Sequence, residues 1–330
     1  MSSDRYSPRD QEGILETVRQ HEGEEAAGYA RVWLERQPHN VIVYRNPNGS
    51  VAGFLFMLAL HEASKDELQS DPLAWKCWSH IDSESPLRAG EAATLFRFWM
   101  DRESHQQISR VQSTIFVNMV RHYLTTPNLA YSLLPIVLPD FWQAIFSYAD
   151  LHRLEALNFS LNDVPFGVYG HDWRRRPPAA WLDLLASRES GTSIEEAPVP
   201  STARPILVLS EEAFVDATRD ALRDYTRPYT LKGNPLLSSR IVADNVDEEA
   251  DDEDRISVLM GLLDESIEAL EQNTRHEKAF RAVYRTYIKP AASQELAAEM
   301  LGIPYSTFRR HLTKGVKEIT DLLWQREVDH

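Results

Sequence analysis

The sequence predicts an α+β fold, in which a mixed sheet flanked by helices is followed by an all-α C-terminal domain. Strand-like and helical segments alternate over residues 1–189, whereas residues 256–330 show helical periodicity alone. A length of 330 residues is typical of two domains. The composition, 43% hydrophobic and 26% charged, is that of an ordinary globular chain and excludes collagen, a disulfide scaffold and wholesale disorder.

The N-terminal region begins with helices and a hairpin. Apolar residues at helical spacing predict one or two helices over Gln11–Arg36, and no strand is visible before them. The β-branched run Asn40–Tyr44 and the apolar run Val51–Leu60 predict two strands. The turn signal Asn46–Gly49 lies between these runs, so we expect an antiparallel hairpin.

Further helices and strands alternate after the hairpin, as expected for a mixed sheet covered by helices. The predicted elements are a helix over Lys65–His80 broken at Asp71-Pro72, a strand over Glu91–Met100, a helix over Ser113–Leu124, a strand over Ala130–Val137, a helix over Phe141–Leu154, strands within Phe159–Tyr169 and a helix over Trp181–Arg188.

A segment of different composition separates this region from the C-terminal helices. Residues 190–204 are rich in Ser, Thr, Pro and Glu and predict a linker. Residues 205–243 predict a helical connecting region, with a short strand at Ile206–Leu209 and a helix over Ser210–Tyr225 that Ser210 caps. Eight of the eleven residues from Asp244 to Asp254 are acidic, so we expect a disordered loop over residues 244–255. A metal site there is disfavoured, because the spacing and glycine of an EF-hand are missing.

Charge is distributed unevenly along the chain. The net charge of -15 excludes a protein that coats nucleic acid over its whole surface, because the summed field repels phosphate. Residues 275–330, however, hold ten basic and seven acidic residues, a charge of +3, which leaves -18 on residues 1–274. A small basic module on an acidic body therefore remains possible.

Several function classes lack their sequence signals. The chain has no P-loop, GxGxxG, GxSxG or HExxH pattern, which counts against an NTPase, a Rossmann enzyme, an esterase and a zinc protease. The 11 histidines are scattered, and no metal is expected. The single cysteine, Cys77, is expected to be buried, and no signal peptide or membrane span is visible. We therefore expect a cytoplasmic protein in a reducing compartment.

The most specific local pattern lies at residues 293–314 and predicts a helix-turn-helix. Ala297 and Ala298 give a small, apolar inner face for close helix packing, and Gly302 follows where the first helix must stop. Ser306 can cap the second helix. The final helix, expected over Val316–Val328, would pack on this hairpin or pair with a second copy of the chain.

The second helix of this pattern places apolar residues inward and polar residues outward. Phe308, Leu312 and Val316 are expected to face the core. Hydroxyls and a helix N-terminus suit phosphates, and arginine suits phosphate or a guanine edge, so we expect contact with double-stranded DNA. A hairpin that only packs or dimerises, and RNA binding, are the alternatives. The expected DNA-binding residues are Tyr305, Ser306, Thr307, Arg309, Arg310, Thr313 and Lys314.

This pattern resembles the helix-turn-helix of sigma-factor region 4 and related bacterial regulators over about 30 residues. It departs from them at His311, where those proteins often carry a basic residue.

The N-terminal region, from Glu12 to Trp173, resembles the GNAT acetyltransferase fold in the order of its elements. The predicted strand over Glu91–Met100 precedes a helix, as the central strand precedes the CoA-binding helix in that family. The strand over Ala130–Val137 would be the next, parallel strand, splayed from the first. The segment Ala144-Ile-Phe-Ser-Tyr148 is similar to the Ala-x-x-x-Tyr of the family.

The resemblance implies a cofactor, acetyl-CoA, whose pyrophosphate is held by backbone N–H groups in a Gln/Arg-x-x-Gly-x-Gly/Ala loop. The matching stretch here is Gln106-Gln-Ile-Ser109-Arg110-Val111, in which Ser109 and Val111 replace the small residues. We expect the Val111 side chain to crowd a phosphate, whereas Arg110 could attract one. The domain is therefore expected to be degenerate. The resemblance makes Tyr148 the candidate general acid, and a packed aromatic is the alternative.

Two further polar groups carry open alternatives. His171-Asp172 could form a polar dyad or a structural cap at a strand end. The run Arg174-Arg175-Arg176 could bind an anion or the flank of DNA, or could be an exposed turn.

Together these patterns favour a DNA-binding protein, similar to a transcription regulator, whose degenerate GNAT-like domain senses a small ligand or a protein partner. The whole chain resembles bacterial proteins without a settled activity that join such a core to a helix-turn-helix. One alternative is an acyl-CoA-dependent N-acetyltransferase with a helix-turn-helix tail. The other is a structural adaptor that dimerises through its C-terminal helices.

Overall fold

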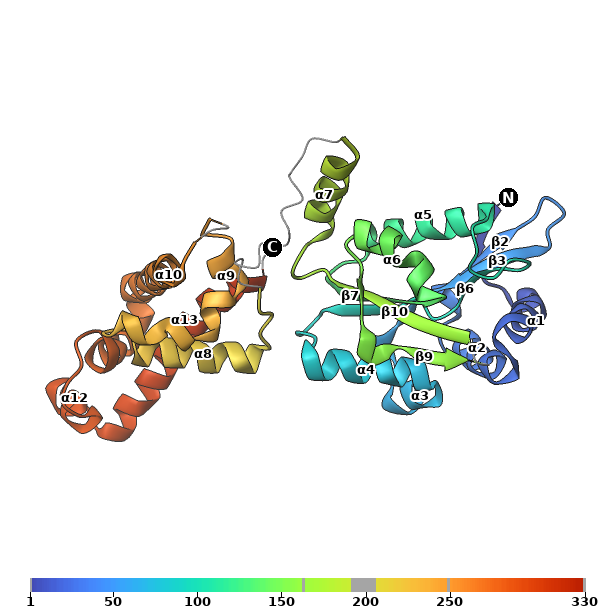
Figure 1. Cartoon of the computed structure of the whole chain (residues 1–330). Helices are drawn as coiled ribbons and strands as arrows, with labels where there is room; N and C mark the ends of the chain where they lie inside the picture. The colour runs from blue at the N-terminus through green and yellow to red at the C-terminus, as the bar shows by residue number, and fades with distance from the viewer. Residues whose placement is uncertain (1, 162–163, 191–205, 248–249, 329–330) are drawn as a thin grey trace. The chain divides into compact units, whose positions relative to one another are not determined.

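The chain folds into two compact units, Met1–Ile194 and Glu195–His330, and each is described by itself. The computed structural model (Figure 1) describes residues 2–161, 164–190, 206–247 and 250–328. The predicted linker, residues 190–204, lies outside these ranges except for Ser190, which is the last residue of a helix.

The first sheet of the N-terminal unit is antiparallel and contains the predicted hairpin. Its strand order is β1-β2-β3-β6. Strands β2 (Val41–Arg45) and β3 (Val51–Phe56) pair across the expected turn, so this prediction is confirmed. Strand β1 (Ser2–Arg5) pairs with β2 where no strand was expected. Its side chains are polar and exposed, because pairing at a sheet edge needs only the backbone groups.

The second sheet of this unit is mixed. Its strands lie in the order β4-β5-β7-β10-β8, with β9 against β10, and only the β5–β7 pair is parallel. The single strand predicted over Glu91–Met100 is in fact two, because residues 96–98 carry the chain from the second sheet to the first. The bounds not given above are β4 Leu58–Ala59, β5 Ala92–Leu95, β6 Trp99–Asp101, β7 Leu129–Val137, β8 His152–Arg153, β9 Phe159–Leu161 and β10 Val164–Asp172.

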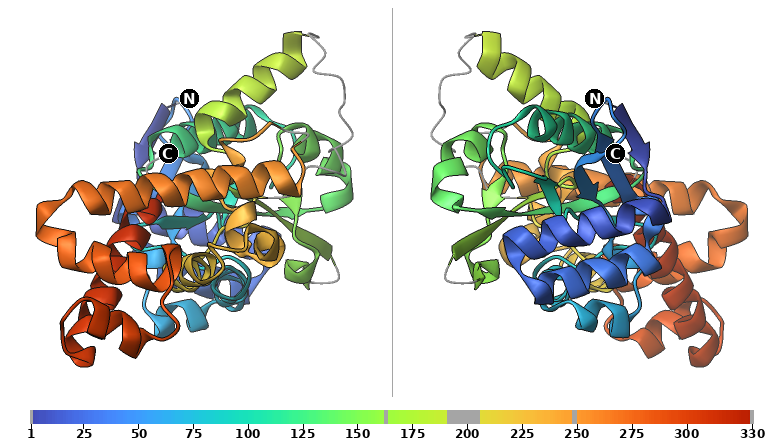
Figure 2. Two further views of the ribbon diagram at one scale, coloured as in Figure 1. Left: turned by 90° about the vertical axis from the view of Figure 1, so that its left-hand side faces the viewer. Right: turned by 90° about the vertical axis from the view of Figure 1, so that its right-hand side faces the viewer.

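Helices cover both faces of these sheets (Figure 1). One face carries α1 and α2, which lie side by side in Figure 2, together with α3 and α4; the other carries α5 and α6. Strand β3 shows the alternation that this requires over residues 54–56, since Phe54 and Phe56 pack toward α1–α4 while Leu55 packs toward α5 and α6. The helices are α1 Gln11–Glu22, α2 Glu24–Arg36, α3 Lys65–Ser70, α4 Pro72–Glu84, α5 Arg110–Thr125, α6 Pro139–Tyr148 and α7 Pro178–Ser190.

Two details of this unit bear on the predictions. Helix α6 ends at Tyr148 rather than Leu154, because the chain turns at Asp150, whose φ is 58°, and the Leu151 amide bonds back to the Phe146 carbonyl. Cys77 is buried, as expected, and burial raises the pKa of its thiol to about 12. The thiol therefore stays protonated and unreactive.

The regular elements described in the C-terminal unit are helices. The segment Ile206–Leu209, predicted as a strand, is not part of a sheet in the structure, and its Leu207 amide donates to the Ser238 carbonyl. Ser210 caps α8 as predicted, accepting a bond from the Ala213 amide. The helices are α8 Glu211–Arg223, α9 Arg240–Ala243, α10 Asp252–Gln272, α11 Glu277–Val283, α12 Gln294–Met300 and α13 Tyr305–Val328, with a π-helical turn, η8, at Tyr284–Ile288.

One hydrophobic core joins the parts of this unit that the sequence suggested were separate. Phe214 and Ile241 from residues 205–243 pack in the same cluster as Leu259 and Phe308. The end of the loop predicted over residues 244–255 is helical. Asp251 caps α10, because its carboxylate accepts bonds from the Glu253 and Asp254 amides. Residues 251–255 therefore begin a helix instead of ending a loop. Carboxylates favour helix N-termini, which explains the difference.

Candidate functional site

The two strands at the centre of the N-terminal unit part from each other. Strands β5 and β7 pair in parallel over Ala92–Leu95. Beyond that point β6 pairs with β3, whereas β7 continues beside β10 as far as Val137. This is the splayed pair that the GNAT resemblance implies. The parting leaves backbone groups of β7 beyond Leu133 without a strand partner on that side.

Side chains of the chain itself bridge this gap. Gln106 is 2% exposed; its Nε2 donates to the Pro135 carbonyl at 3.3 Å, and its Oε1 accepts from the Val137 amide at 2.7 Å. The fully buried Trp99 donates its indole N–H to the same Pro135 carbonyl at 2.9 Å. Gln106, a predicted cofactor residue, is therefore a structural bridge between the strands.

The other predicted cofactor residues also have structural positions, with one exception. Ser109 caps α5 by accepting from the Gln112 amide. Val111 is buried against β3, where a Cβ added at Gly53 would lie 2.5 Å from its Cγ1. The expectation that Val111 crowds a phosphate is thus wrong, because its side chain points into the core. Arg110 is exposed. The side chains of Gln106, Ser109 and Val111 are thus engaged within the fold, and we derive no chemistry through an acyl-CoA.

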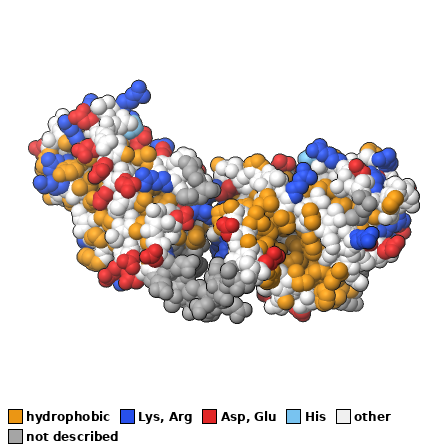
Figure 3. All heavy atoms as spheres, turned by 90° about the horizontal axis from the view of Figure 1, so that it is seen from above, with side chains coloured by type: hydrophobic (Ala, Val, Ile, Leu, Met, Phe, Trp, Pro, Cys, Tyr) orange, Lys and Arg blue, Asp and Glu red, His pale blue; other side chains and the backbone are white. Residues whose placement is uncertain are grey.

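Tyr148 lies on an outer apolar face of the same unit. It is 45% exposed, and its carbonyl accepts a bond from the Arg188 guanidinium. The expectation of a packed core aromatic is not met. Phe141 and Ile145 are exposed on the same helix, and Val117 on α5. Figure 3 shows hydrophobic side chains gathered over this side of the unit. Large exposed apolar faces mark contact sites for other molecules.

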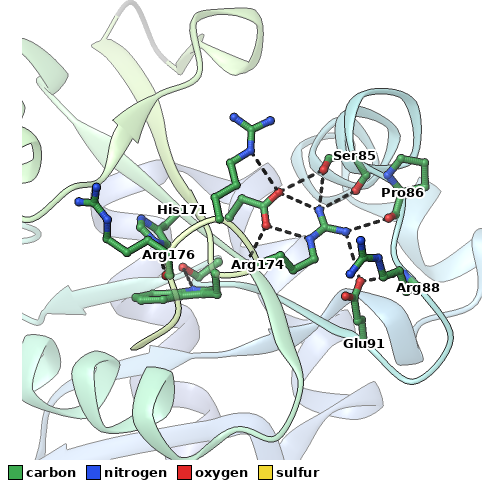
Figure 4. Close-up of polar contacts among 11 residues, drawn as sticks. Ser85, Pro86, Arg88, Glu91, His171, Arg174 and Arg176 are labelled. Atoms are coloured by element: carbon green, nitrogen blue, oxygen red, sulfur yellow. Dashed lines mark hydrogen bonds and ion pairs between the residues drawn. The ribbon is translucent and has the colours of Figure 1, made fainter. Parts of the chain in front are cut away.

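Arg174 is buried in a polar cluster at the end of β10 (Figure 4). Its guanidinium donates to both oxygens of Asp172, at 2.8 and 2.9 Å, and to Ser85 Oγ at 2.6 Å, and it pairs with Glu91 at 3.2 Å. Burial alone would lower the pKa of Arg174, but the bonds to Asp172 raise it above its usual value. The guanidinium is charged, and each of its nitrogens is already bonded within the cluster. The expectations of an anion-binding site and of an exposed turn are therefore both wrong for Arg174. The side chain of Arg175 is 53% exposed and lies in solvent.

His171 belongs to the same strand end and forms no dyad with Asp172. Its Nδ1 contacts the Asp150 carbonyl at 2.7 Å and its Nε2 the Arg176 carbonyl at 3.1 Å. The ring lies 4.2 Å from that of Trp173. The imidazole therefore joins backbone segments, as the structural alternative predicted.

The α12–α13 segment of the C-terminal unit has the predicted turn. Ser293 caps α12, and Gly302 has a φ of +65° at the point where the first helix stops. Helix α13 begins at Tyr305, two residues earlier than a cap at Ser306 implies, because the Pro304 carbonyl accepts from the Phe308 amide. Ser306 therefore lies in the first turn and is not the cap. The final helix predicted over Val316–Val328 is a continuation of α13.

The inner side of α13 is anchored closely. Phe308 is fully buried and Leu312 and Val316 nearly so. At Gly315 the helix meets α11, since an added Cβ would lie 2.6 Å from Val283 Cγ2 and 3.0 Å from the Ala279 carbonyl oxygen. Because glycine allows this approach, the orientation of α13 against α11 is fixed by backbone contact.

The outer side of α13 carries the predicted DNA-binding residues. All are exposed except Thr307, which is half-buried. Burial lowers the pKa of His311, and the charges of Arg310, Lys278 and Lys314 lower it further. Lys278 lies on α11, so the fold brings a third cation to Arg310 and Lys314. Sequence reasoning missed Lys278, because only the packing of α11 on α13 places it there.

The described residues lack two further features, a metal-binding cluster and a membrane-spanning helix. They contain no group of three or more His, Cys, Asp or Glu side chains placed to hold a metal ion. Among the same residues, no helix combines the length and the apolar character that crossing a bilayer requires.

Comparison with known proteins gave similarity to solved structures alone. No family model and no curated protein matches the chain. It is similar to a GNAT-family acetyltransferase from Bacillus cereus ATCC 10987, with 10% identity, a TM-score of 0.32, and coverage of 52% of this chain and 96% of that one. An N-acetyltransferase from Staphylococcus aureus Mu50 has 10% identity and a TM-score of 0.33, with coverage of 52% and 100%. Arabidopsis thaliana NAA60, in complex with a bisubstrate analogue, has 12% identity and a TM-score of 0.32, with coverage of 51% and 94%.

Proposed function

We propose that the chain is a DNA-binding protein of the transcription-regulator type, with a non-catalytic, acetyltransferase-like N-terminal unit as its sensing module. The observation that carries this proposal is the start of α13. There Arg310 and Lys314 are exposed beside Lys278, on a helix that Phe308 and Gly315 hold from the other side.

The α12–turn–α13 arrangement suits the major groove of DNA. That groove is about 12 Å wide and accepts one α-helix. The first turns of α13 would enter it, with arginine and lysine on base edges or phosphates, while Tyr305, Ser306 and Thr313 offer hydroxyls to the backbone. The turn at Gly302 would bring α12 across the phosphates, as in helix-turn-helix proteins.

The proposed sensing role of the N-terminal unit rests on two features. The gap between β6 and β7 is bridged by Gln106 and Trp99, which supports a non-catalytic unit over an N-acetyltransferase. The exposed apolar face around Phe141 and Ile145 offers surface that a protein partner could bury.

The adaptor alternative is less well supported. It requires apolar side chains along the end of α13 that are free to pair with a second copy. Ile319 and Leu323 are buried in the unit's own core, and Trp324 packs against Phe214 with ring centroids 5.0 Å apart. Leu322 is the large apolar residue exposed on this part of the helix before Val328.

The test uses the full chain, because deleting residues 275–330 would remove part of the common core of the C-terminal unit. Binding of a labelled duplex of random sequence is measured by fluorescence anisotropy at low salt. We expect the double variant R310A/K314A to weaken binding by roughly 10- to 100-fold, because two cationic contacts are lost.

The matched control removes two positive charges elsewhere in the same unit. Arg223 and Arg326 are both exposed and both form surface ion pairs. The variant R223A/R326A should bind duplex within about threefold of the wild type, since only the long-range field changes. Equal losses in the two double variants would contradict the assignment to α13.

A further inference from the structure

A cleft of about 430 Å³ lies beside the outer face of α13, within the C-terminal unit. Helix α8 forms one wall and α13 the other, and η8 and the start of α12 add Tyr287 and Gln294. This volume is in the range of small-molecule sites. The cleft divides the predicted DNA-binding set, because Arg309 and Thr313 line it whereas Arg310 and Lys314 do not.

The floor of the cleft is apolar. Val215 on α8 and Leu312 and Val316 on α13 line it. Both α13 residues keep a small exposed area of 7%. An apolar body of a ligand could therefore cover side chains that water now reaches.

The charges of the cleft leave one cation for a ligand. Arg219 pairs with Asp216 at 2.7 Å, and Lys317 pairs with Asp321. The bond to Asp321 raises the pKa of Lys317, and the charge of Glu211, the other acidic residue of the lining, raises it further. Among the described residues, Arg309 is the lining cation without a carboxylate partner. A free guanidinium beside an apolar floor favours a carboxylate, which it can bind through two parallel hydrogen bonds.

Polar donors complete the lining. The π-helical turn η8 presents Tyr287, and such turns recur at binding sites. Burial raises the pKa of Tyr287, so its hydroxyl remains a donor at neutral pH. Thr313 and Gln294 offer a hydroxyl and an amide on the facing side.

We propose that this cleft binds a small organic monocarboxylate with a flat apolar body, whose carboxylate pairs with Arg309. The body covers Val215, Leu312 and Val316. The proposal rests on the proposed function in one respect: a bound anion one residue from Arg310 weakens DNA binding, because it occupies Arg309 and opposes phosphate. By linkage, DNA weakens ligand binding by the same factor.

The site is tested first without DNA. The probes are 2-naphthoate, which is fluorescent and anionic, and its neutral analogue 2-naphthamide, titrated against the full chain. We expect saturable binding of 2-naphthoate and at least tenfold weaker binding of 2-naphthamide. R309A should weaken 2-naphthoate binding at least tenfold, and R310A should change it by less than about threefold. Circular dichroism checks that both variants keep the wild-type helix content.

Three results of this titration would overturn the site. These are no saturable binding of 2-naphthoate below roughly 10 mM, equal affinity for acid and amide, and equal affinity of wild type and R309A. Each separates recognition by Arg309 from general apolar adsorption.

The coupling is tested in a second titration, with the duplex used above. Saturating 2-naphthoate should weaken DNA binding by the wild type about five- to tenfold and leave R309A unaffected. A chain that binds 2-naphthoate as expected but binds no duplex would overturn the proposed function and the coupling, while the cleft assignment stands. A chain whose duplex binding depends on Arg310 and Lys314, but which ignores 2-naphthoate, would overturn the cleft alone.

Discussion

Arginine side chains have different environments in two regions of the molecule. In the N-terminal unit Arg45, Arg97 and Arg174 are buried, and each pairs with a carboxylate, at 2.8, 2.7 and 2.8 Å respectively. At the start of α13, Arg309 and Arg310 are exposed. The buried arginines hold carboxylates within the fold, and we propose that the exposed ones contact another molecule. Of the run Arg174-Arg175-Arg176, Arg174 is structural, whereas Arg175 lies in solvent.

The largest loss of stability is expected from removing a buried arginine. R174A leaves Asp172 buried without its partner, and losing one member of a buried pair costs about 3–5 kcal/mol. Urea unfolding followed by tryptophan fluorescence measures this, because all tryptophans but Trp324 precede residue 190. R175A is the matched control, and its exposed pair with Asp172 at 3.9 Å should contribute less than about 0.5 kcal/mol. Similar losses in both variants would remove the distinction.

The buried His122 of the N-terminal unit makes the stability of the fold depend on pH. Burial in the N-terminal unit lowers the pKa of His122 to about 4, from a usual 6.5. The folded state therefore keeps the ring neutral, while the unfolded chain takes up a proton as the pH falls below 6.5. Stability is complete above that pH and is lost toward pH 4, by about 2 kcal/mol between roughly pH 7.5 and 4.5. Urea unfolding of wild type and H122Q across this range should show a steeper decline for the wild type, and parallel declines would exclude His122 as the cause.

Gln106 and Gln107 repeat the contrast between a buried, hydrogen-bonded side chain and an exposed one. Q106A leaves the Pro135 carbonyl and the Val137 amide without the Gln106 side chain, so we expect a loss of about 1–3 kcal/mol. Gln107 is exposed, and Q107A should change stability by less than about 0.5 kcal/mol. Denaturant midpoints of the two variants decide the matter. An unchanged midpoint for Q106A would show that the bridge across the gap contributes nothing.

The smallest effect concerns two glycines of the C-terminal unit. Gly302 has a φ of +65°, so G302A should destabilise the unit by about 1 kcal/mol. Gly261 lies within α10 with open space around it, and G261A should stabilise by about 0.5–1 kcal/mol. Thermal unfolding followed by helix circular dichroism should therefore shift in opposite directions. Shifts of the same sign would contradict the left-handed stop between α12 and α13.

Local patterns in the sequence predict most of the elements, and their limits are physical. Alternation and turn residues predict the β2–β3 hairpin, and the cap Ser210 predicts the start of α8. Strand β1 escapes prediction, because an exposed edge strand has no apolar alternation to detect. The break between β5 and β6 escapes as well, because it depends on which strands lie beside each one.

The candidate sites were predictable to different degrees. The exposure of Arg310 and Lys314 follows from the helical period of Phe308 and Leu312. The position of Arg309 in the cleft depends on where α8 packs, which no local pattern records. The bridging role of Gln106 depends likewise on strands that meet only in the folded sheet.

The salt dependence of duplex binding decides whether α13 holds cations for DNA. The logarithm of the association constant is plotted against that of the salt concentration for wild type, R310A/K314A and R223A/R326A. Each phosphate contact contributes about 0.9 to the slope, so R310A/K314A should be shallower than the wild type by up to about 1.8, while R223A/R326A keeps the wild-type slope. Absence of wild-type binding at about 50 mM salt, or one slope for all three proteins, would contradict the account.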